Sequence, residues 1–233
     1  MDLKSKIILV SGPTASGKSA FSIKLAEKIN GEIINADSMQ VYKGLEIISS
    51  QPSIIDKTKI CHFLYGFYHI EKNFSVGEWL SLVINIVNSD KLNNRIPIVV
   101  GGTGLYLFAL RNGLSPIPKI DEITKYNTNL LFERIGIEGF RKKVIEIDPV
   151  YSSKYNDKQR LLRAYNVYVA TGKTLSYWHK IKLKPAINKN IYLIHLKTEK
   201  EKLYNFCDTR FDRFLENGAL EEVKKIWERK IDR

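Results

Sequence analysis

Along this chain of 233 residues, short runs of apolar residues alternate with longer segments in which apolar residues recur at helical spacing. Residues 6–12 form a short apolar run rich in branched side chains, which is typical of a buried strand. Residues 19–29 carry apolar side chains at helical spacing, and the Asn30-Gly31 pair predicts the end of that helix. The same pattern predicts further strands at 32–37, 96–104 and 190–196, and further helices at 75–90, 198–217 and 219–230.

Strands that alternate with helices predict a doubly wound α/β protein with a parallel sheet. One stretch departs from this alternation. Two prolines within 113–121 mark a boundary, and from there to residue 189 the chain is helical in pattern, basic and rich in tyrosine. We therefore expect a sheet domain in two parts, residues 1–112 and 190–233, with a helical insertion at 113–189. A Thr198-x-x-Glu201 capping box is expected to open the first helix after the last strand.

The positive charge is concentrated in the predicted insertion. The chain has a formal net charge of +12, of which residues 141–189 contribute +9 and all other residues together only +3. A concentrated cationic segment is the electrostatic footprint of a nucleic-acid partner. Composition alone does not distinguish such a partner from a solvated basic face, or from the lysine excess of an AT-rich genome.

The most specific motif lies between the first predicted strand and the first predicted helix. It has the spacing Gly-x-x-x-x-Gly-Lys-Ser, in which backbone amide groups and a helix N-terminus surround phosphate oxygens. The lysine supplies a positive charge, and the serine hydroxyl can ligate Mg²⁺. We therefore predict a P-loop NTPase-like fold with a phosphate site formed by Gly12, Pro13, Thr14, Ala15, Ser16, Gly17, Lys18 and Ser19.

Two further residues are expected beside this loop, because the carboxyl ends of parallel strands meet at one edge of a sheet. Asp37 ends the second predicted strand, and Thr103 follows the third. Asp37 is either a cap of the following turn or a general base, and Thr103 is either a small turn residue or a hydroxyl directed at a ligand. The third strand ends in glycines, where many nucleotide hydrolases and kinases carry an acidic residue for Mg²⁺. Ordinary phosphoryl transfer is therefore less favoured, although it is not excluded.

Five segments of the chain together resemble the bacterial tRNA dimethylallyltransferases. They are GPTASGKS, NADSMQVYKGL, VVGGTGLYL, DKQRLLRAYNVYVATGKTLS and RFDRFLENGALEEV, in the order and at the spacing of that family. The resemblance implies transfer of a dimethylallyl group from dimethylallyl diphosphate to N6 of adenosine 37, in the anticodon stem-loop of tRNA. The glycine-rich loop would then bind a pyrophosphate leaving group, and an acidic residue after the third strand would not be needed.

The resemblance also implies roles for individual residues. Asp37 would accept a proton from N6, and Thr103 would orient the same nitrogen. Lys18 and Arg210 would stabilise the pyrophosphate, together with Mg²⁺ bound at Ser19. The tRNA contacts implied in this way are Asp37, Ser38, Met39, Gln40, Thr103, Lys125, Gln159, Arg160, Leu161, Leu162 and Arg163.

The sequence departs from the family pattern at several places. The segment 48–52 lacks the usual lysine, Cys61-His62-Phe63 replaces a histidine-rich segment, and Phe206 and Lys125 stand where arginine is usual. The sequence also stops where family members continue with further helices, which predicts a truncated chain with weakened tRNA binding.

Two alternatives remain open on the sequence alone. One is a small-molecule or nucleotide kinase with the same loop, and the other is a truncated homologue that binds tRNA without catalysis. No apolar run suits a signal sequence or a membrane span, and the two cysteines show neither paired nor metal-ligand spacing. We therefore expect a monomeric cytoplasmic protein that does not associate with membranes.

Overall fold

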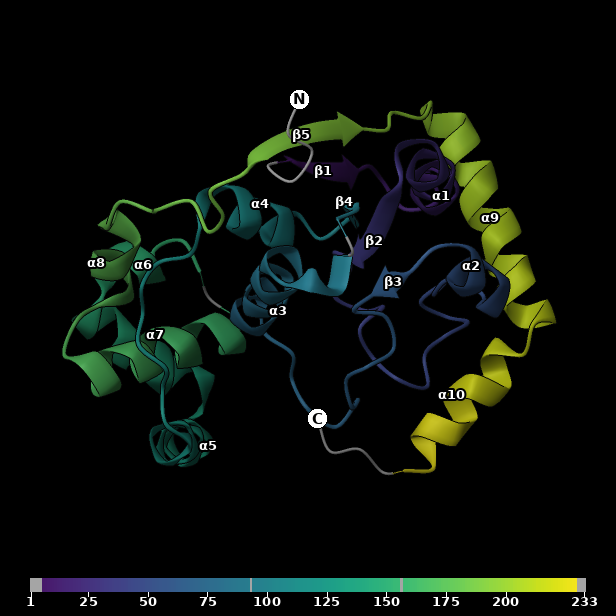
Figure 1. Cartoon of the computed structure of the whole chain (residues 1–233). Coiled ribbons are helices and arrows are strands. Elements are labelled where there is room, and N and C mark those ends of the chain that lie inside the picture. Colours follow the sequence, from purple (N-terminus) through teal and green to yellow (C-terminus); the bar gives the residue numbers. More distant parts are fainter. Residues whose placement is uncertain (1–5, 93, 156, 230–233) are drawn as a thin grey trace. The chain divides into compact units, whose positions relative to one another are not determined.

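The structure, a computed structural model, describes residues 6–92, 94–155 and 157–229 (Figure 1). The chain divides into two compact units, which are residues 1–113 with 185–233, and residues 114–184. We call these the sheet unit and the helical unit. The sequence pattern placed the helical insertion at 113–189, whereas Gly113 and the residues from Pro185 onward belong to the sheet unit.

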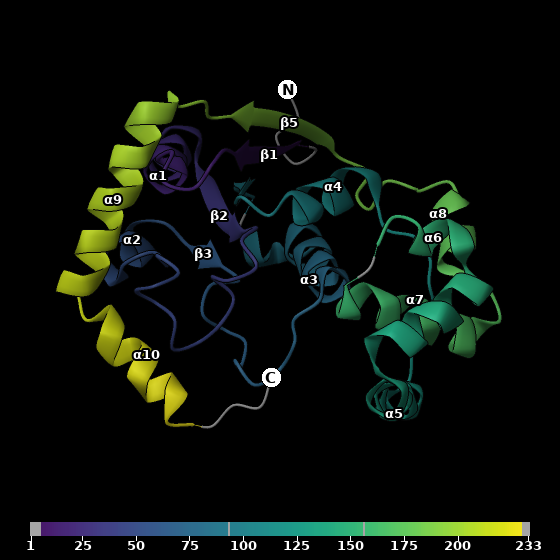
Figure 2. The ribbon, with the colours of Figure 1, turned by 180° about the vertical axis from the view of Figure 1, so that it is seen from behind.

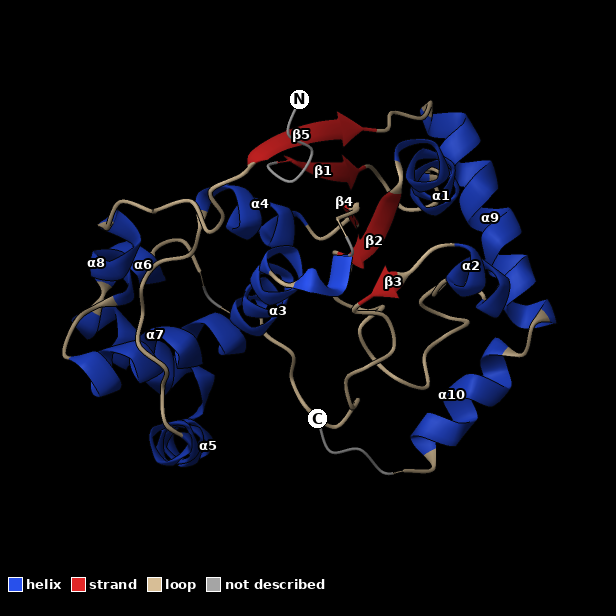
Figure 3. Cartoon of the chain, in the orientation of Figure 1, coloured by secondary structure: helices blue, strands red, loops and turns tan. Residues whose placement is uncertain are grey.

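Within the described residues, the sheet unit contains a five-stranded sheet whose strands all run parallel. The strand order is β3-β2-β4-β1-β5 (Figure 3). The predicted strands all form, and the short β3 is added to them. The bounds are β1 (Lys6–Ser11), β2 (Gly31–Asn35), β3 (His62–Phe63), β4 (Ile96–Val100) and β5 (Asn190–His195).

The register of the central strands brings distant chain segments to one edge of the sheet. Val10 of β1 pairs with Val100 of β4, and Asn35 of β2 pairs with the same Val100. β2 and β4 are buried at every position, as is typical of central parallel strands that are covered on both faces. The glycine-rich loop after β1, Asp37 after β2 and Thr103 after β4 therefore leave the sheet at the same edge.

The helices of the sheet unit include four that the sequence pattern predicts and two that it does not. The two additional helices are α2, which is short and has no buried residue, and α4, which starts within a glycine-rich segment. Figures 1 and 2 show α9 passing beside α1, with α10 following it. The bounds are α1 (Lys18–Ile29), α2 (Ile54–Lys59), α3 (Val76–Asn88), a 3₁₀ helix (Asp90–Leu92), α4 (Gly104–Asn112), α9 (Lys200–Glu216) and α10 (Ala219–Trp227).

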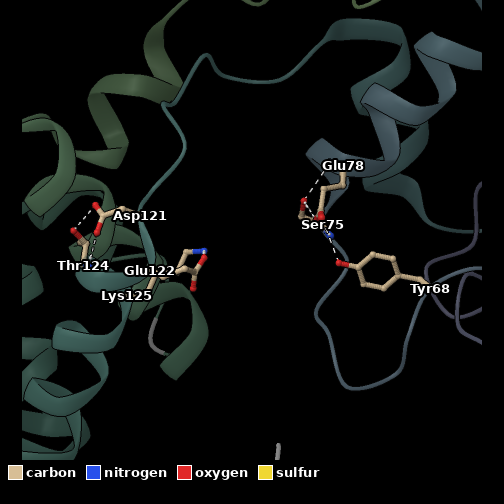
Figure 4. Close-up of polar contacts among 7 residues, drawn as sticks. All are labelled: Tyr68, Ser75, Glu78, Asp121, Glu122, Thr124 and Lys125. Atoms are coloured by element: carbon tan, nitrogen blue, oxygen red, sulfur yellow. Dashed lines mark hydrogen bonds and ion pairs between the residues drawn. The ribbon is translucent and has the colours of Figure 1, made fainter.

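A reciprocal capping box fixes the start of α3. The amide of Glu78 donates to Ser75 Oγ at 3.2 Å, and the amide of Ser75 donates to Glu78 Oε2 at 2.9 Å (Figure 4). The hydroxyl of Tyr68 donates to Glu78 Oε1 at 3.3 Å and ties the preceding loop to the same carboxylate. The entry into α3 is therefore set by side chains that lie close in sequence.

The capping box predicted at Thr198 does not form. Helix α9 begins at Lys200, so that Glu199 takes the N-cap position without a side-chain capping bond. Glu201 then lies at the second helical position, whereas the reciprocal box requires the third. Glu199 instead forms an ion pair with Lys202, at 2.7 Å. The prediction is wrong because the helix starts one residue later than the box requires.

The helical unit contains no strand among its described residues. Its core lies around the packing of α5 against α7, with Phe140 and Leu161 both fully buried. Asp148 is also buried, and its two carboxylate oxygens accept from the amides of Tyr151 at 3.1 Å and Ser176 at 2.8 Å. The helices are α5 (Glu122–Ile147), which bends at Gly136, α6 (Pro149–Ser152), α7 (Lys158–Thr171) and α8 (Leu175–Lys180).

No helix in the described part of the chain combines the length and the apolar character that crossing a bilayer requires.

We predict that Gly101→Ala destabilises the sheet unit. A Cβ at this position would lie 2.1 Å from the carbonyl oxygen of Ala36, so that β2 and β4 would have to separate. The expected loss in the free energy of unfolding is at least about 2 kcal/mol, measured by chemical denaturation.

Gly104→Ala in the same glycine-rich segment is the matched control, since nothing lies within 4 Å of a Cβ added there. As the first residue of α4, an alanine should be neutral or stabilising by at most about 1 kcal/mol. Equal stability of the two variants would contradict the proposed role of the backbone contact.

Candidate active site

The loop between β1 and α1 is held by close backbone packing. Gly12 has a φ of 156°, and a Cβ there would lie 2.8 Å from Ser16 Oγ and 2.9 Å from the carbonyl oxygen of Leu196. Only glycine fits this position without displacing the start of the chain after β5. The hydroxyl of Ser11 and Nδ1 of His195 are 2.9 Å apart and link the ends of β1 and β5 directly below the loop.

Lys18 is the cation of this loop. Its ammonium group donates to the carbonyl oxygens of Gly12 at 2.9 Å and Pro13 at 2.6 Å. Burial lowers the pKa of Lys18, the carboxylate of Asp37 opposes that effect, and the positive charge of Arg210 adds to it. Lys18 therefore lies within electrostatic reach of both Asp37 and Arg210, although the three residues are far apart in sequence.

An unpartnered hydroxyl also belongs to the loop. Ser16 Oγ is inaccessible to solvent and has no hydrogen-bond partner among the described residues. A buried hydroxyl without a partner costs free energy, and a phosphate oxygen bound at the loop would supply the partner. The loop thus fits the anion that its sequence predicts.

Asp37 is positioned by its own backbone and by Asn35. Asp37 Oδ1 accepts from the amide of Met39 at 2.9 Å, which is the local capping role weighed for this residue from the sequence. The amide of Asp37 donates to Asn35 Oδ1 at 2.8 Å. One carboxylate oxygen therefore shapes the turn, and this arrangement fixes the orientation of the side chain.

Asn35 holds the end of β2 and was not identified from the sequence. It is fully buried, and its side-chain amide donates to the carbonyl oxygens of Asp37 at 2.9 Å and Leu64 at 3.0 Å. The carbonyl oxygen of Asn35 accepts from Trp79 Nε1 at 2.7 Å. The available sequence signal is a polar residue that follows Ile33 and Ile34 at the end of the strand, two residues before the predicted base.

Thr103 lies beside the same turn. Its Oγ1 accepts from the amide of Ser38 at 3.0 Å, and its amide donates to the carbonyl oxygen of Ala36 at 3.3 Å. Thr103 occupies the N-cap position of α4, but its hydroxyl makes no capping bond to that helix. The hydroxyl thus joins the ends of β4 and β2, as their common sheet edge predicts.

The side chains of the segment that follows Asp37 differ in their exposure and in their partners. Met39 is about half exposed, at 53%. The side-chain amide of Gln40 donates to the carbonyl oxygens of Ser49 and Ser50, both at 2.8 Å, and therefore braces a neighbouring turn. Of the predicted contact residues in this segment, Gln40 thus has a structural partner that the sequence did not indicate.

Two tyrosines near Asp37 complete this part of the site and were not identified from the sequence. Burial and then the negative charge of Asp37 raise the pKa of Tyr65. Burial is the largest cause that raises the pKa of Tyr106, and electrostatic interactions with Tyr42, Asp37 and Glu78 add to it, so that this pKa reaches about 12. Tyr106 also stacks on Trp79, with ring centroids 4.5 Å apart. Both phenols stay neutral at physiological pH and are available as hydrogen-bond donors near the carboxylate.

Arg210, on α9, lies near enough to Lys18 for its positive charge to lower the pKa of Lys18. Its guanidinium lies 5.1 Å from the ring centroid of Phe214, one helical turn further along. Phe206, which stands where the related family usually has an arginine, is about half exposed, at 51%. Helix α9 thus provides a positive charge near Lys18 through Arg210, whereas Phe206 of the same helix carries no charge.

The described residues contain no group of three or more His, Cys, Asp or Glu side chains able to hold a metal ion. Ser19, the second residue of α1, is exposed and carries the hydroxyl predicted for Mg²⁺. Mg²⁺ commonly keeps most of its waters and takes only one or two protein ligands beside substrate phosphates. A single serine hydroxyl therefore fits an ion that arrives with a diphosphate.

Two of the basic residues predicted for RNA in the helical unit form ion pairs within that unit. Lys125 Nζ lies 2.7 Å from Glu122 Oε1 (Figure 4). Arg160 lies 3.0 Å from Asp157 Oδ2 and stacks on a tyrosine ring. These are exposed pairs within one helix turn, whose contribution to stability is small. Both cations can exchange such a partner for a phosphate.

The neighbours of Arg160 on α7 divide into exposed and buried residues. Gln159 and Arg163 are exposed, and partial desolvation, opposed by Tyr151, lowers the pKa of Arg163 without removing its charge. Leu161 is fully buried and Leu162 packs against the same core. The predicted RNA contact of Leu161 is therefore corrected, because its side chain holds α7 against α5 and is inaccessible to a ligand.

The parallel sheet, the glycine-rich loop and the half-buried lysine of that loop define a P-loop-type α/β protein. Comparison with known proteins specifies the class further. The family model described as IPP transferase matches residues 40–233, and the model described as isopentenyl transferase matches residues 5–62. The chain belongs to the tRNA dimethylallyltransferase family and is a prenyltransferase. The kinase alternative is therefore not supported.

The relatives and solved structures agree with this assignment. The tRNA dimethylallyltransferase of Pelagibacter ubique is 44% identical over 99% of this chain and 74% of its own length, and that of Maricaulis maris is 39% identical over 97% and 74%. A eukaryotic dimethylallyltransferase, in a crystallographic study of its action on tRNA, is similar with a TM-score of 0.81 and 32% identity. The match covers 96% of this chain but only 56% of that one.

A bacterial structure shows the same fold. The full-length tRNA isopentenylpyrophosphate transferase from Bacillus halodurans is similar with a TM-score of 0.63 and 29% identity, over 97% of this chain and 71% of that chain. The P-loop NTPase-like fold predicted from the sequence is thereby confirmed.

We predict that Asn35→Asp destabilises the sheet unit and disorders the Asp37 turn. A carboxylate cannot donate to the carbonyl oxygens of Asp37 and Leu64, and it would be a buried charge without a cationic partner. The expected loss in the free energy of unfolding is about 3 kcal/mol or more at neutral pH, measured by chemical denaturation.

Asn205→Asp on the exposed face of α9 is the control with the same chemical change. It should change the free energy of unfolding by at most about 0.5 kcal/mol. A small effect of Asn35→Asp, equal to that of the control, would show that the end of β2 is held by other contacts.

Proposed function

We propose that this protein transfers a dimethylallyl group from dimethylallyl diphosphate to N6 of adenosine 37 in the anticodon stem-loop of tRNA, with release of pyrophosphate. The observation that carries the proposal is the single sheet edge at which the phosphate loop, Asp37 and Thr103 meet, with Lys18 and Asp37 electrostatically coupled. Membership of the tRNA dimethylallyltransferase family supports prenyl transfer as the reaction at this edge.

The loop would bind the leaving group. The amides of residues 12–19, the Ser16 hydroxyl and the ammonium group of Lys18 would contact the diphosphate, and Arg210 would approach from α9. Negative charge grows on the diphosphate as the allylic carbon–oxygen bond lengthens, so cations fixed in advance stabilise the transition state more than the substrate. Mg²⁺ bound with the diphosphate at Ser19 would supply further charge neutralisation.

The acceptor nitrogen would be activated at the end of β2. The exocyclic nitrogen of adenine is a weak nucleophile, because its lone pair is delocalised into the ring. Asp37 would accept the proton that N6 loses as the new carbon–nitrogen bond forms, while the old carbon–oxygen bond breaks and pyrophosphate leaves. Thr103 would hydrogen-bond the same nitrogen and orient it toward the allylic carbon.

RNA binding would involve both units of the chain. The target adenine must leave its stack to expose N6, so a flipped base is expected in contact with residues 37–40. In the helical unit we propose that Lys125, Gln159, Arg160, Leu162 and Arg163 contact the anticodon stem, since these residues are at least partly accessible. We further propose that the protein acts as a monomer in the cytoplasm, where its substrate tRNA is found.

The function is tested with radiolabelled dimethylallyl diphosphate and an unmodified anticodon stem-loop RNA, by measuring label in the RNA. We predict that Asp37→Asn lowers the rate at saturating substrates by about 10² to 10⁴, the usual effect of removing a positioned base. The asparagine can still accept from the amide of Met39, so the turn and the affinity for RNA should change little.

Asp90→Asn, an exposed change with the same chemistry, is the control and should transfer at the rate of the unchanged protein. Loss of RNA affinity together with rate in Asp37→Asn would identify Asp37 as a structural cap. Absence of label with the unchanged protein, despite binding of the diphosphate and RNA, would favour the binding-only alternative.

We also predict that Arg160→Glu combined with Arg163→Glu weakens RNA binding and flattens its salt dependence. Each phosphate contact that is lost should lower the slope of log affinity against log salt by about 0.7 to 0.9. The slope is measured by fluorescence anisotropy of labelled stem-loop RNA over a salt series.

Lys24→Glu combined with Lys28→Glu, on the exposed face of α1, makes the same change in net charge outside the helical unit. This control separates local contacts from the overall charge of the protein. Equal slopes for both double variants would mean that the exposed arginines of α7 are only a solvated surface.

A further inference from the structure

A carboxylate on α10 binds the backbone of a turn that lies 174 and 175 residues earlier in the chain. Glu222 Oε1 accepts from the amide of Ile47 at 2.8 Å, and Glu222 Oε2 accepts from the amide of Ile48 at 2.9 Å. Both oxygens of one carboxylate are thus directed at two consecutive amides. Hydrogen bonds to an ionised acceptor are stronger than those between neutral groups.

The turn that receives this carboxylate resembles a short piece of helix. The amide of Ser49 donates to the carbonyl oxygen of Leu45 at 3.1 Å, and the amide of Ser50 donates to that of Ile47 at 2.9 Å. In such a turn the first amides have no partner within the turn itself and carry partial positive charge. Glu222 therefore serves as the cap of a turn to which it is not adjacent in sequence.

The other end of the same turn is bound by Gln40. The side-chain amide of Gln40 donates to the carbonyl oxygens of Ser49 and Ser50, both at 2.8 Å. The carboxylate of Glu222 and the amide of Gln40 hold opposite ends of the turn, and Gln40 belongs to the segment 37–40 proposed to receive the adenine.

A groove lies between part of α10 and this region. An open groove borders Glu222, with Gly44, Glu46 and Ile47 on one side and Lys225 and other residues of the α10 segment on the other. The paired hydrogen bonds of Glu222 thus join α10 to the turn at the border of this groove.

We infer that Glu222 is a positioning residue for the acceptor side of the reaction: it fixes the turn at 45–50 and, through Gln40, the segment 37–40. This inference rests on the proposed function and deepens it. The diphosphate side depends on the loop at 12–19, which Glu222 does not contact. Loss of the carboxylate should therefore impair use of RNA and spare use of the diphosphate.

The test compares Glu222→Ala and Glu222→Gln with Glu221→Gln, an exposed neighbour on the same helical turn. Initial transfer rates are measured against RNA concentration and, separately, against dimethylallyl diphosphate concentration. Glu222→Ala should lower kcat/KM for RNA by about tenfold to 10²-fold, because a small misplacement of a substrate-binding segment has effects of this size. The KM for the diphosphate should stay within about twofold.

The two replacements at Glu222 should differ in degree. Glutamine keeps one oxygen that can accept from an amide, so Glu222→Gln should recover part of the RNA-dependent activity. Glu221→Gln should behave as the unchanged protein. Unchanged kinetics with RNA in Glu222→Ala, or equal losses toward RNA and diphosphate, would overturn the positioning role.

Hydrogen–deuterium exchange provides a readout that does not require activity. In Glu222→Ala, exchange should become faster in peptides that cover 44–50 and also in those that cover 37–43, while the loop at 12–19 keeps its protection. Unchanged exchange at 37–43 would overturn the inference. If the unchanged protein transfers no label, the proposed function fails, and the exchange result still decides whether Glu222 holds both segments.

Discussion

The active-site edge depends on how closely the backbones of β2 and β4 approach each other where both strands end. The carbonyl group of Ala36 occupies the space that a side chain at residue 101 would need. This approach lets the amide of Thr103 reach the carbonyl oxygen of Ala36, and lets its hydroxyl accept from the amide of Ser38. The glycine at 101 is therefore a requirement of the backbone geometry that brings the two strand ends together.

The second constraint at this edge is electrostatic. Lys18 lies near one carboxylate, that of Asp37, and near a second positive charge, that of Arg210, so the charge around Lys18 is positive in balance. Burial makes this arrangement costly, as the lowered pKa of Lys18 indicates. An anionic ligand with several oxygens relieves both the burial of the cation and the unpartnered hydroxyl of Ser16. The charge at this edge thus favours an anionic ligand over a neutral one.

Much of this could be predicted from the sequence, because the relevant signals are local. The loop motif, the predicted strands and the common edge of Asp37 and Thr103 follow from spacing and from the geometry of parallel sheets. The functions of Asn35, Gln40 and Glu222 depend on partners distant in the chain or on backbone groups, which leave no periodic signal. Helices α2 and α4 were not predicted for another reason. Helix α2 is too short to show a helical period, and α4 begins in a glycine-rich segment.

The place of the helical unit within the chain also has a consequence for the order in which the protein folds. β1 pairs on one side with β4 and on the other side with β5, and in the second pairing Ser11 lies opposite His195. During synthesis from the N-terminus, the outer edge of β1 therefore stays open until the whole helical unit has left the ribosome. Contacts between α5 and α7 are local by comparison and form sooner. The helical unit thus sets the interval during which the unfinished sheet is exposed to pairing with other chains.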